Sequence, residues 1–318
     1  LITGIGLSEV GHKVVNFDID SQKIEKLQEG YLPIYESGLG KILRNNIDVG
    51  RLRFTTDMED AVSSGTIIFV AVGTPIGADG WADLSDLTRV SEDLGCYMDG
   101  YKVLAIRSTV PPGSIEEIRS ILSMKRSEGK DFDIVVNPEF LREGYGLCDF
   151  LSPDRIVIGS DSEKATLLMR QVYEPILGRR TGRSVAGGDT DEDGLVPFID
   201  TDVKSAQMIK YCSNAFLAAR VSFVNEIAGL CEMVEADIKE VAKGIGYDPR
   251  IGHKYLDPGL GFGGPCIEKD LRTLIRSAEH HQYDPLMLKA ILMRNDQQVK
   301  DIVSKLRSLL GGSLQGKI

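Results

Sequence analysis

Short runs of β-branched and aliphatic residues alternate, along the first half of the chain, with stretches whose apolar residues recur at helical spacing. The run Ile67–Val72 is apolar on both faces, which is typical of a strand buried in a parallel sheet. The stretches 20–28 and 84–97 show the amphipathic pattern of helices. This alternation predicts an α/β fold with a doubly wound parallel sheet and crossover helices. The predicted strands cover residues 13–18, 65–72, 101–107, 133–136 and 155–159.

The pattern of the second half of the chain predicts helices. A long helical pattern runs from residue 201 to about 236, and a helix of this length usually braces domains or a dimer interface. A further helix at 238–244, a Gly/Pro-rich loop at 256–265 and helices to about residue 310 follow. The polar stretch 178–194, rich in Gly, Arg and Asp, predicts a surface loop or linker. We therefore expect a Rossmann-like sheet followed by an all-helical central domain.

Composition narrows the possible partners. The 318 residues include 47 acidic and 37 basic side chains, for a formal net charge of −10, which speaks against nonspecific binding to nucleic acid or to anionic membranes. No apolar run approaches the roughly 18 residues of a membrane span, and no signal peptide is recognisable. Five scattered cysteines without a CxxC pair predict reduced thiols in the cytoplasm. The four histidines lack metal-ligand spacing, so we expect no metal site.

Asp18 ends the first predicted strand. In dinucleotide-binding folds an acidic residue at a strand end binds the adenosine ribose of NAD and disfavours the 2′-phosphate of NADP; the alternative is an ordinary strand-end aspartate. The preceding Gly4 and Gly6 do not form the glycine fingerprint, because Glu9 stands at the third glycine position and the interval to Asp18 is too short. We expect both glycines inside the first helix, where small residues allow close packing on the sheet.

Polar residues follow the predicted strands at Thr74, Thr109 and Glu139. Ligands of doubly wound sheets bind at the carboxyl ends of the strands, so these positions suit the rim of a ligand site. Glu139 and Glu143 lie just after a strand, and the alternative for both is a solvated turn.

Two further groups could carry chemistry. A glycine loop leads into a predicted helix with Cys266 near its N-terminus, where the helix dipole favours a thiolate; the alternative is an inert buried thiol. Asp270 follows four residues later on the same face. Lys210 and Asn214 are likewise four residues apart on the long helix, and the lysine either snorkels to the surface or faces a cleft.

Several of these segments, in this order, resemble the UDP-glucose/GDP-mannose dehydrogenase family nearly end to end, and most closely its UDP-glucose branch. The segments that carry the resemblance are 72–75, 108–111, 137–144, 153–159, 214–218, 241–252 and 261–270.

The resemblance implies a four-electron oxidation of a nucleotide-sugar C6 hydroxyl to a carboxylate with two NAD and one water, with UDP-glucose giving UDP-glucuronate. It makes Cys266 the nucleophile that forms a thiohemiacetal and then a thioester. Lys210 and Asn214 would stabilise the oxyanions, and Asp270 would orient water or assist proton transfer. Glu139, a candidate base, and Thr109 would lie on the proton-relay side. The alternatives are GDP-mannose or UDP-N-acetylmannosamine oxidation, and a non-catalytic relative that binds a nucleotide-sugar.

The resemblance also implies the residues that line each ligand and a homodimer formed through the long helix, with Arg250 reaching the partner's substrate. Residues implied for NAD are Asp18, Lys23, Thr74, Thr109, Glu143 and Lys269. Residues implied for the sugar nucleotide are Glu139, Phe140, Leu141, Arg142, Glu143, Lys210, Asn214, Arg250, Tyr255, Leu256, Asp257, Pro258, Gly259 and Gly263.

The chain departs from the family pattern in three places. Pro265 and Glu268 flank the cysteine, and we expect a slower nucleophile because Pro265 stiffens the loop and Glu268 adds negative charge. The loop from residue 179 to 194 is longer than usual. The family's first strand with its glycine loop and its C-terminal nucleotide domain are not represented, so we expect the 318 residues alone to be inactive. The expected domains are an NAD-binding domain at 1–198, a helical domain at 199–300 and a connector at 301–318 that opens the third domain.

Overall fold

The computed structural model describes residues 1–77, 80–178 and 195–314. They form two compact units, the first comprising residues 1–74 and 84–210 and the second residues 75–83 and 211 onward. All but the first residue of the predicted loop at 178–194, and the last residues of the predicted connector, lie outside the described residues.

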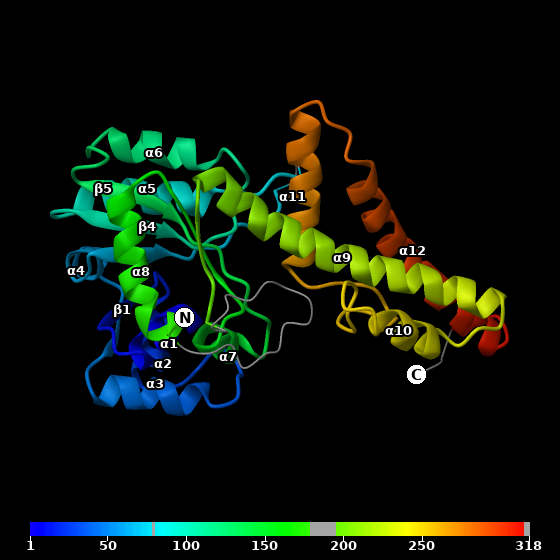
Figure 1. The fold of residues 1–318 in the computed structure, drawn as a ribbon. Helices are drawn as coiled ribbons and strands as arrows, with labels where there is room; N and C mark the ends of the chain where they lie inside the picture. Colours follow the sequence, from blue (N-terminus) through cyan, green and yellow to red (C-terminus); the bar gives the residue numbers. More distant parts are fainter. Residues whose placement is uncertain (78–79, 179–194, 315–318) are drawn as a thin grey trace. The chain divides into compact units, whose positions relative to one another are not determined.

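Parallel strands form the centre of the first unit (Figure 1). β1 (Val14–Phe17) pairs in parallel with β2 (Leu52–Thr55), and a second sheet has the order β3-β4-β5-β6-β7. All five predicted strands are confirmed to within two residues, whereas β2 and β7 were not predicted. β6 runs antiparallel to β5, an exception to the parallel arrangement expected. The strands of the second sheet are β3 (Ile67–Val70), β4 (Lys102–Ile106), β5 (Phe132–Val136), β6 (Ile156–Ser160) and β7 (Phe198–Thr201).

Helices connect these strands. The predicted helices at 20–28 and 84–97 are confirmed as α2 and α5, and the Asp20 side chain caps α2 by accepting from the Lys23 amide. The helices of this unit are α1 (Ile2–Glu9), α2 (Ser21–Gln28), α3 (Leu39–Asp48), α4 (Met58–Ser63), α5 (Ser85–Tyr97), α6 (Ile115–Ser123), α7 (Gly146–Leu151) and α8 (Glu163–Leu177).

The central strands bury side chains on both faces, which explains their continuous apolar sequence. Leu104 and Ile106 of β4 pack in a core with α5 and α6. Val103 and Ala105, which alternate with them, pack in a second core with α7 and α8. In Figure 1, α8 lies across one face of the sheet while α5 and α6 cover the other. The doubly wound Rossmann-like fold is therefore confirmed.

The second unit is built from helices. The predicted long helix is confirmed as α9 (Val203–Met233), which begins in the first unit and continues into the second. Its buried residues Tyr211, Ala215 and Ala218 recur at helical spacing and share a core with α11 and α12. The other helices are α10 (Ile238–Gly246), α11 (Ile267–His280) and α12 (Leu286–Leu309).

The structure was also searched for membrane-spanning helices and disulfides. Within the described ranges, no helix combines the length and apolarity that crossing a bilayer requires. No disulfide joins the five cysteines, all of which lie in the described part of the chain.

Candidate active site

Asp18 follows the last residue of β1, as predicted for a ribose-binding carboxylate. Lys23, in the first turn of α2, donates a hydrogen bond to its Oδ2 and forms an ion pair with it. Burial alone would raise the pKa of Asp18, but hydrogen bonds from Lys23 and from the Asp20 amide bring the net pKa below its ordinary value. Asp18 is thus an ionised acceptor at a strand end, a group that fits the ribose hydroxyls of a dinucleotide.

Gly4 and Gly6 lie inside α1, as expected, and both are buried. A Cβ on Gly4 would collide with the Asn16 side chain of β1, and one on Gly6 with the ring of Phe150 in α7. The two glycines therefore let α1 approach the strand and the neighbouring helix closely. This close packing is the role of small residues in the first helix of a dinucleotide fold.

The loops after β3 and β4 are fastened to each other at the carboxyl end of the sheet. The buried Thr74 hydroxyl donates to the Thr109 carbonyl over 2.9 Å. Ser108 Oγ donates to the Val72 carbonyl over 2.7 Å. The structure thus brings together two of the residues implied for the cofactor, Thr74 and Thr109.

A buried polar network beneath these loops was not predicted. Asn137, directly after β5, donates to the Val157 carbonyl over 2.9 Å and accepts from Arg107 (3.0 Å) and Tyr173 (2.6 Å). Arg107 also donates to Thr3 in the first turn of α1. These partners are separated by 20 to 104 positions in the sequence, so no local pattern indicates them. The network fixes the start of the loop that carries Glu139.

Glu139 and Lys210 form the second cluster in this unit. Lys210 is buried, and its Nζ lies 2.7 Å from the Glu139 carbonyl oxygen and 3.2 Å from Oε1. Phe140 packs beside them, with its ring centre 5.4 Å from Lys210 Nζ and 3.7 Å from the Arg155 guanidinium. Burial lowers the pKa of Arg155. Lys210 is therefore a buried cation at a carboxylate, and the surface alternative considered for it is wrong.

Cys266 is the N-cap residue of α11, as the sequence predicted. Its carbonyl accepts from the Asp270 amide over 2.9 Å, and its side chain is exposed. The alternative of a buried thiol is therefore wrong. The unusual Glu268 next to it forms an ion pair with Arg272, at 2.7 Å. Part of its negative charge is thus compensated within the first turns of the helix.

Asp270 is the most buried carboxylate of the second unit's candidate residues, at 1% exposed. It accepts from Asn214 Nδ2 and from Lys269 Nζ, each over 2.6 Å. Tyr211 lies one turn before Asn214, and burial together with the charge of Asp270 raises the pKa of its phenol. The structure thus joins three predicted residues, Asn214, Lys269 and Asp270, into one cluster.

The glycine-rich loop before Cys266 is held by three buried amide side chains that were not predicted from the sequence. Asn295 of α12 accepts from the Phe262 amide (2.8 Å) and donates to the Phe262 carbonyl (3.0 Å). Gly259 donates to Asn225 of α9 (2.8 Å), and its carbonyl accepts from Gln298 of α12 (2.6 Å). Because glycine-rich segments are intrinsically flexible, these bonds give the predicted substrate loop a defined conformation.

Several predicted residues stand apart from these clusters, among them the exposed Tyr255, Asp257 and Gly263. The Arg250 side chain is 86% exposed and pairs with Asp248 at 2.6 Å, and Glu143 is exposed. Because the Arg250 side chain is exposed, it is accessible to a partner molecule.

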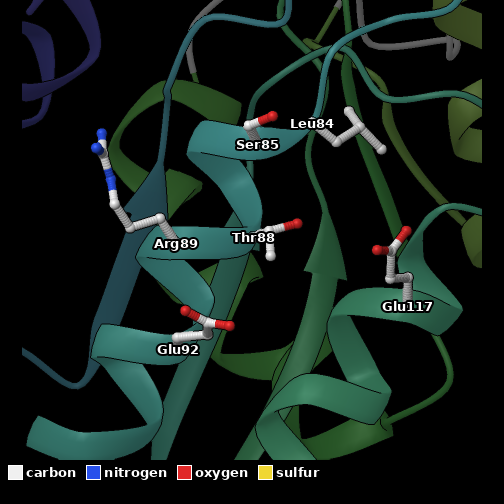
Figure 2. Close-up of a pocket in the computed structure, with 6 residues that line it drawn as sticks. All are labelled: Leu84, Ser85, Thr88, Arg89, Glu92 and Glu117. Atoms are coloured by element: carbon white, nitrogen blue, oxygen red, sulfur yellow. The ribbon is translucent and has the colours of Figure 1, made fainter.

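One hollow of about 560 Å³ lies away from all predicted site residues, between the N-terminal halves of α5 and α6. Figure 2 shows Glu117 of α6 across from Thr88 of α5. Its lining consists of Leu84, Ser85, Thr88, Arg89, Glu92 and Glu117. It has no group in common with the clusters above and is not part of the candidate site.

Comparison with known proteins gives concordant matches over the whole chain. Residues 1–177 match the NAD binding domain of the UDP-glucose/GDP-mannose dehydrogenase family, and residues 204–297 match the family's central domain. A UDP-glucose 6-dehydrogenase of Bacillus subtilis is 41% identical over all of this chain, and one of Pseudomonas aeruginosa is 39% identical. The chain spans 65% and 67% of their respective lengths.

Solved structures of the same family also superpose on this chain. A UDP-glucose dehydrogenase from Pyrobaculum islandicum superposes with a TM-score of 0.88 and is 34% identical, over 98% of this chain and 68% of that one. A GDP-mannose dehydrogenase from Pseudomonas aeruginosa gives a TM-score of 0.71 and 31% identity, over 96% of this chain and 68% of that one.

Proposed function

Since the chain belongs to the UDP-glucose/GDP-mannose dehydrogenase family, we propose that its protein oxidises the C6 hydroxyl of UDP-glucose to a carboxylate, giving UDP-glucuronate. The observation that carries this proposal is the position of Cys266, exposed at the N-terminus of α11, one turn before a buried Asp270 that Asn214 and Lys269 hold. UDP-glucose is favoured among the family's substrates because the curated relatives that match the whole chain are named for it.

The first unit contains five of the six residues proposed to bind the cofactor. NAD, when bound, accepts a hydride from the substrate carbon. Asp18 would accept the adenosine ribose hydroxyls, and its negative charge would repel a 2′-phosphate. Thr74 and Thr109, which fasten the loops after β3 and β4, would line the same cofactor together with Glu143 and Lys269.

Cys266 would carry the covalent chemistry. After the alcohol has lost its first hydride and a proton, the Cys266 thiolate adds to the aldehyde carbon and forms a thiohemiacetal. Loss of the second hydride leaves a thioester, and water then cleaves the C–S bond, releasing the carboxylate and the thiol. The dipole of α11 favours negative charge on the sulfur. Overall, one alcohol, two NAD⁺ and one water would give one carboxylate, two NADH and three protons.

Four polar residues would stabilise the developing charges and transfer protons in these steps. Lys210 and Asn214, one turn apart on α9, would stabilise the oxyanions as a cation and an amide donor. Asp270 would orient water or assist proton transfer, and Glu139 would act as the base in thioester hydrolysis. The sugar nucleotide would contact residues 139–143, the loop 255–259, Gly263 and Arg250.

The decisive experiment measures NADH formed per UDP-glucose by the complete protein, with GDP-mannose and UDP-N-acetylmannosamine in parallel. We expect two NADH per UDP-glucose, with slower turnover of the other two sugars. Cys266→Ser should lower steady-state turnover by a factor on the order of a thousand, because the second oxidation needs the thioester. The exposed Cys96→Ser on α5 is the matched control and should leave the rate unchanged.

Two outcomes would contradict the proposal. A Cys266→Ser protein that forms NADH at the wild-type rate would remove the thioester route. A wild-type protein that binds UDP-glucose without forming NADH would instead be a nucleotide-sugar-binding relative.

We also infer a homodimer formed through α9, in the cytoplasm. Phe216, Phe223 and Leu230 are spaced by seven residues and are 63%, 54% and 55% exposed. Seven residues are close to two helical turns, so the three side chains lie along one side of α9. An exposed apolar stripe of this kind is typical of a helix that packs against another chain.

A further inference from the structure

Glu36, in the segment between α2 and α3, binds the start of α7 far away in the sequence. Its Oε1 accepts from the Gly146 amide over 3.1 Å, and its Oε2 accepts from the Leu147 amide over 2.9 Å. The first amides of a helix have no acceptor within the helix. A carboxylate there forms charge-assisted bonds and is favoured by the helix dipole. Glu36 therefore holds α7 by its first turn.

The contact depends on a glycine. A Cβ on Gly146 would lie 2.8 Å from Glu36 Oε1, closer than real Cβ contacts occur. In its present position the carboxylate reaches both amides because residue 146 has no Cβ, and an alanine there would push the flexible end of the Glu36 side chain away. Gly146 and Glu36 thus form a matched pair 110 positions apart.

α7 in turn holds the loop that precedes it. Asp149 of α7 is buried and accepts from the Arg142 amide (3.0 Å), Nε (2.9 Å) and Nη2 (2.6 Å). Within the same loop, Glu139 Oε2 accepts from the Leu141 amide over 2.5 Å. Glu36 thus holds the start of α7, and Asp149 of α7 holds Arg142 in the loop at 139–143.

We propose that Glu36 is a positioning residue that fixes the 139–143 loop, and with it Glu139, for nucleotide-sugar oxidation. The inference rests on the proposed function, because Glu139 acts on a substrate only if the protein is this enzyme. Its physical basis is separate, since the bonds from Glu36 to α7 exist whether or not any substrate turns over.

Glu36→Gln tests the proposal, because glutamine keeps the size of the side chain but replaces one acceptor oxygen with a donor. We expect hydrogen exchange of the Gly146 and Leu147 amides to accelerate by at least about tenfold, since bonds to charged groups are the stronger ones. We expect kcat with UDP-glucose to fall by about tenfold or more, while KM for NAD, to which this loop contributes only Glu143, should rise by a smaller factor than kcat falls. Glu29→Gln, at an exposed position between α2 and Glu36, is the control and should change neither quantity.

Gly146→Ala provides a second, independent route to the same contact. It should reproduce the faster exchange and the lower kcat, and the double variant should be no worse than the more severe single one, because both remove one interaction. Wild-type exchange rates at residues 146 and 147 in both variants, or an unchanged kcat, would overturn the proposal. If the wild-type protein forms no NADH, the proposed function fails while the exchange measurement still decides whether Glu36 holds α7.

Discussion

Asp18 and Lys23 show how two charges at one strand end can set a preference between cofactors. The lysine stabilises the ionised carboxylate. The carboxylate in turn engages the lysine ammonium group in an ion pair. A 2′-phosphate approaching this pair would meet the negative member at the position proposed for the ribose hydroxyls. The preference for NAD would therefore depend on the aspartate rather than on the absence of a nearby cation.

Replacing Asp18 by Ser should weaken NAD and improve NADP at the same time. Loss of a charged acceptor costs about 1.5–3 kcal/mol, so we expect KM for NAD to rise by about 10- to 100-fold. Lys23, released from its ion pair, should then favour the 2′-phosphate. Initial rates with both cofactors measure the change, with the exposed Glu25→Gln on α2 as control. An unaltered ratio of kcat/KM for the two cofactors would show that Asp18 does not contact the ribose.

At this scale, local sequence was informative where chemistry depends on a single position in an element. Asp18 at a strand end and Cys266 at a helix start are examples, and both lie where the pattern placed them. Arg107, Asn137 and Glu36 were missed because their partners are distant in the sequence. A polar residue that is buried through such bonds has the same local pattern as one in a solvated turn.

At the scale of elements, the loop before Cys266 depends on two helices that are distant from it in the sequence, one earlier and one later in the chain. α9 supplies Asn225, and α12 supplies Asn295 and Gln298, so the loop is fastened from both sides. Gly261 is also required, because its φ is +102° and a Cβ there would collide with Asn295. The loop is thus rigid where its composition alone suggests flexibility.

Asn295→Ala should destabilise this arrangement. It leaves the amide and carbonyl of Phe262 without their partner in a buried site, at about 1–3 kcal/mol for each group. We expect the free energy of unfolding to fall by about 2–4 kcal/mol in urea denaturation. Asp296→Ala, at the exposed neighbouring position, should stay within about 0.5 kcal/mol of the wild type. Unchanged denaturation of Asn295→Ala would mean that the loop is held by other contacts.

The elements themselves were predictable in proportion to their length and burial. β4 and β5, buried throughout, were predicted almost to the residue. β2 carries the exposed Arg53 between buried residues, so it lacks the continuous apolar run by which β3, of the same length, was identified. The antiparallel direction of β6 was not predictable either, because strand direction depends on the connection and leaves no mark on a strand's own residues.

At the scale of the whole molecule, the proposed anionic ligands would require an acidic chain to hold cations at defined places. Lys210 and Lys269 are each paired with a carboxylate, Glu139 and Asp270. The long-range field of a net charge of −10 does not attract a sugar nucleotide. If the proposed function holds, binding would rely on short-range contacts at these positions, and it should be less sensitive to salt than binding to a broadly basic surface.

The association of two molecules is the last property that the surface of α9 predicts. Phe216, Phe223 and Leu230 are separated by about 10 Å along the helix axis at each step, so an acidic residue at the middle position would interrupt the stripe. Phe223→Glu should convert a dimer into monomers at micromolar concentration, as measured by sedimentation equilibrium, because burying an unpaired carboxylate is strongly unfavourable. Leu167→Glu makes the same change at an exposed apolar position of α8 and should leave the dimer intact. A monomeric wild-type protein, or a Phe223→Glu protein that remains dimeric, would show that this stripe does not form the interface.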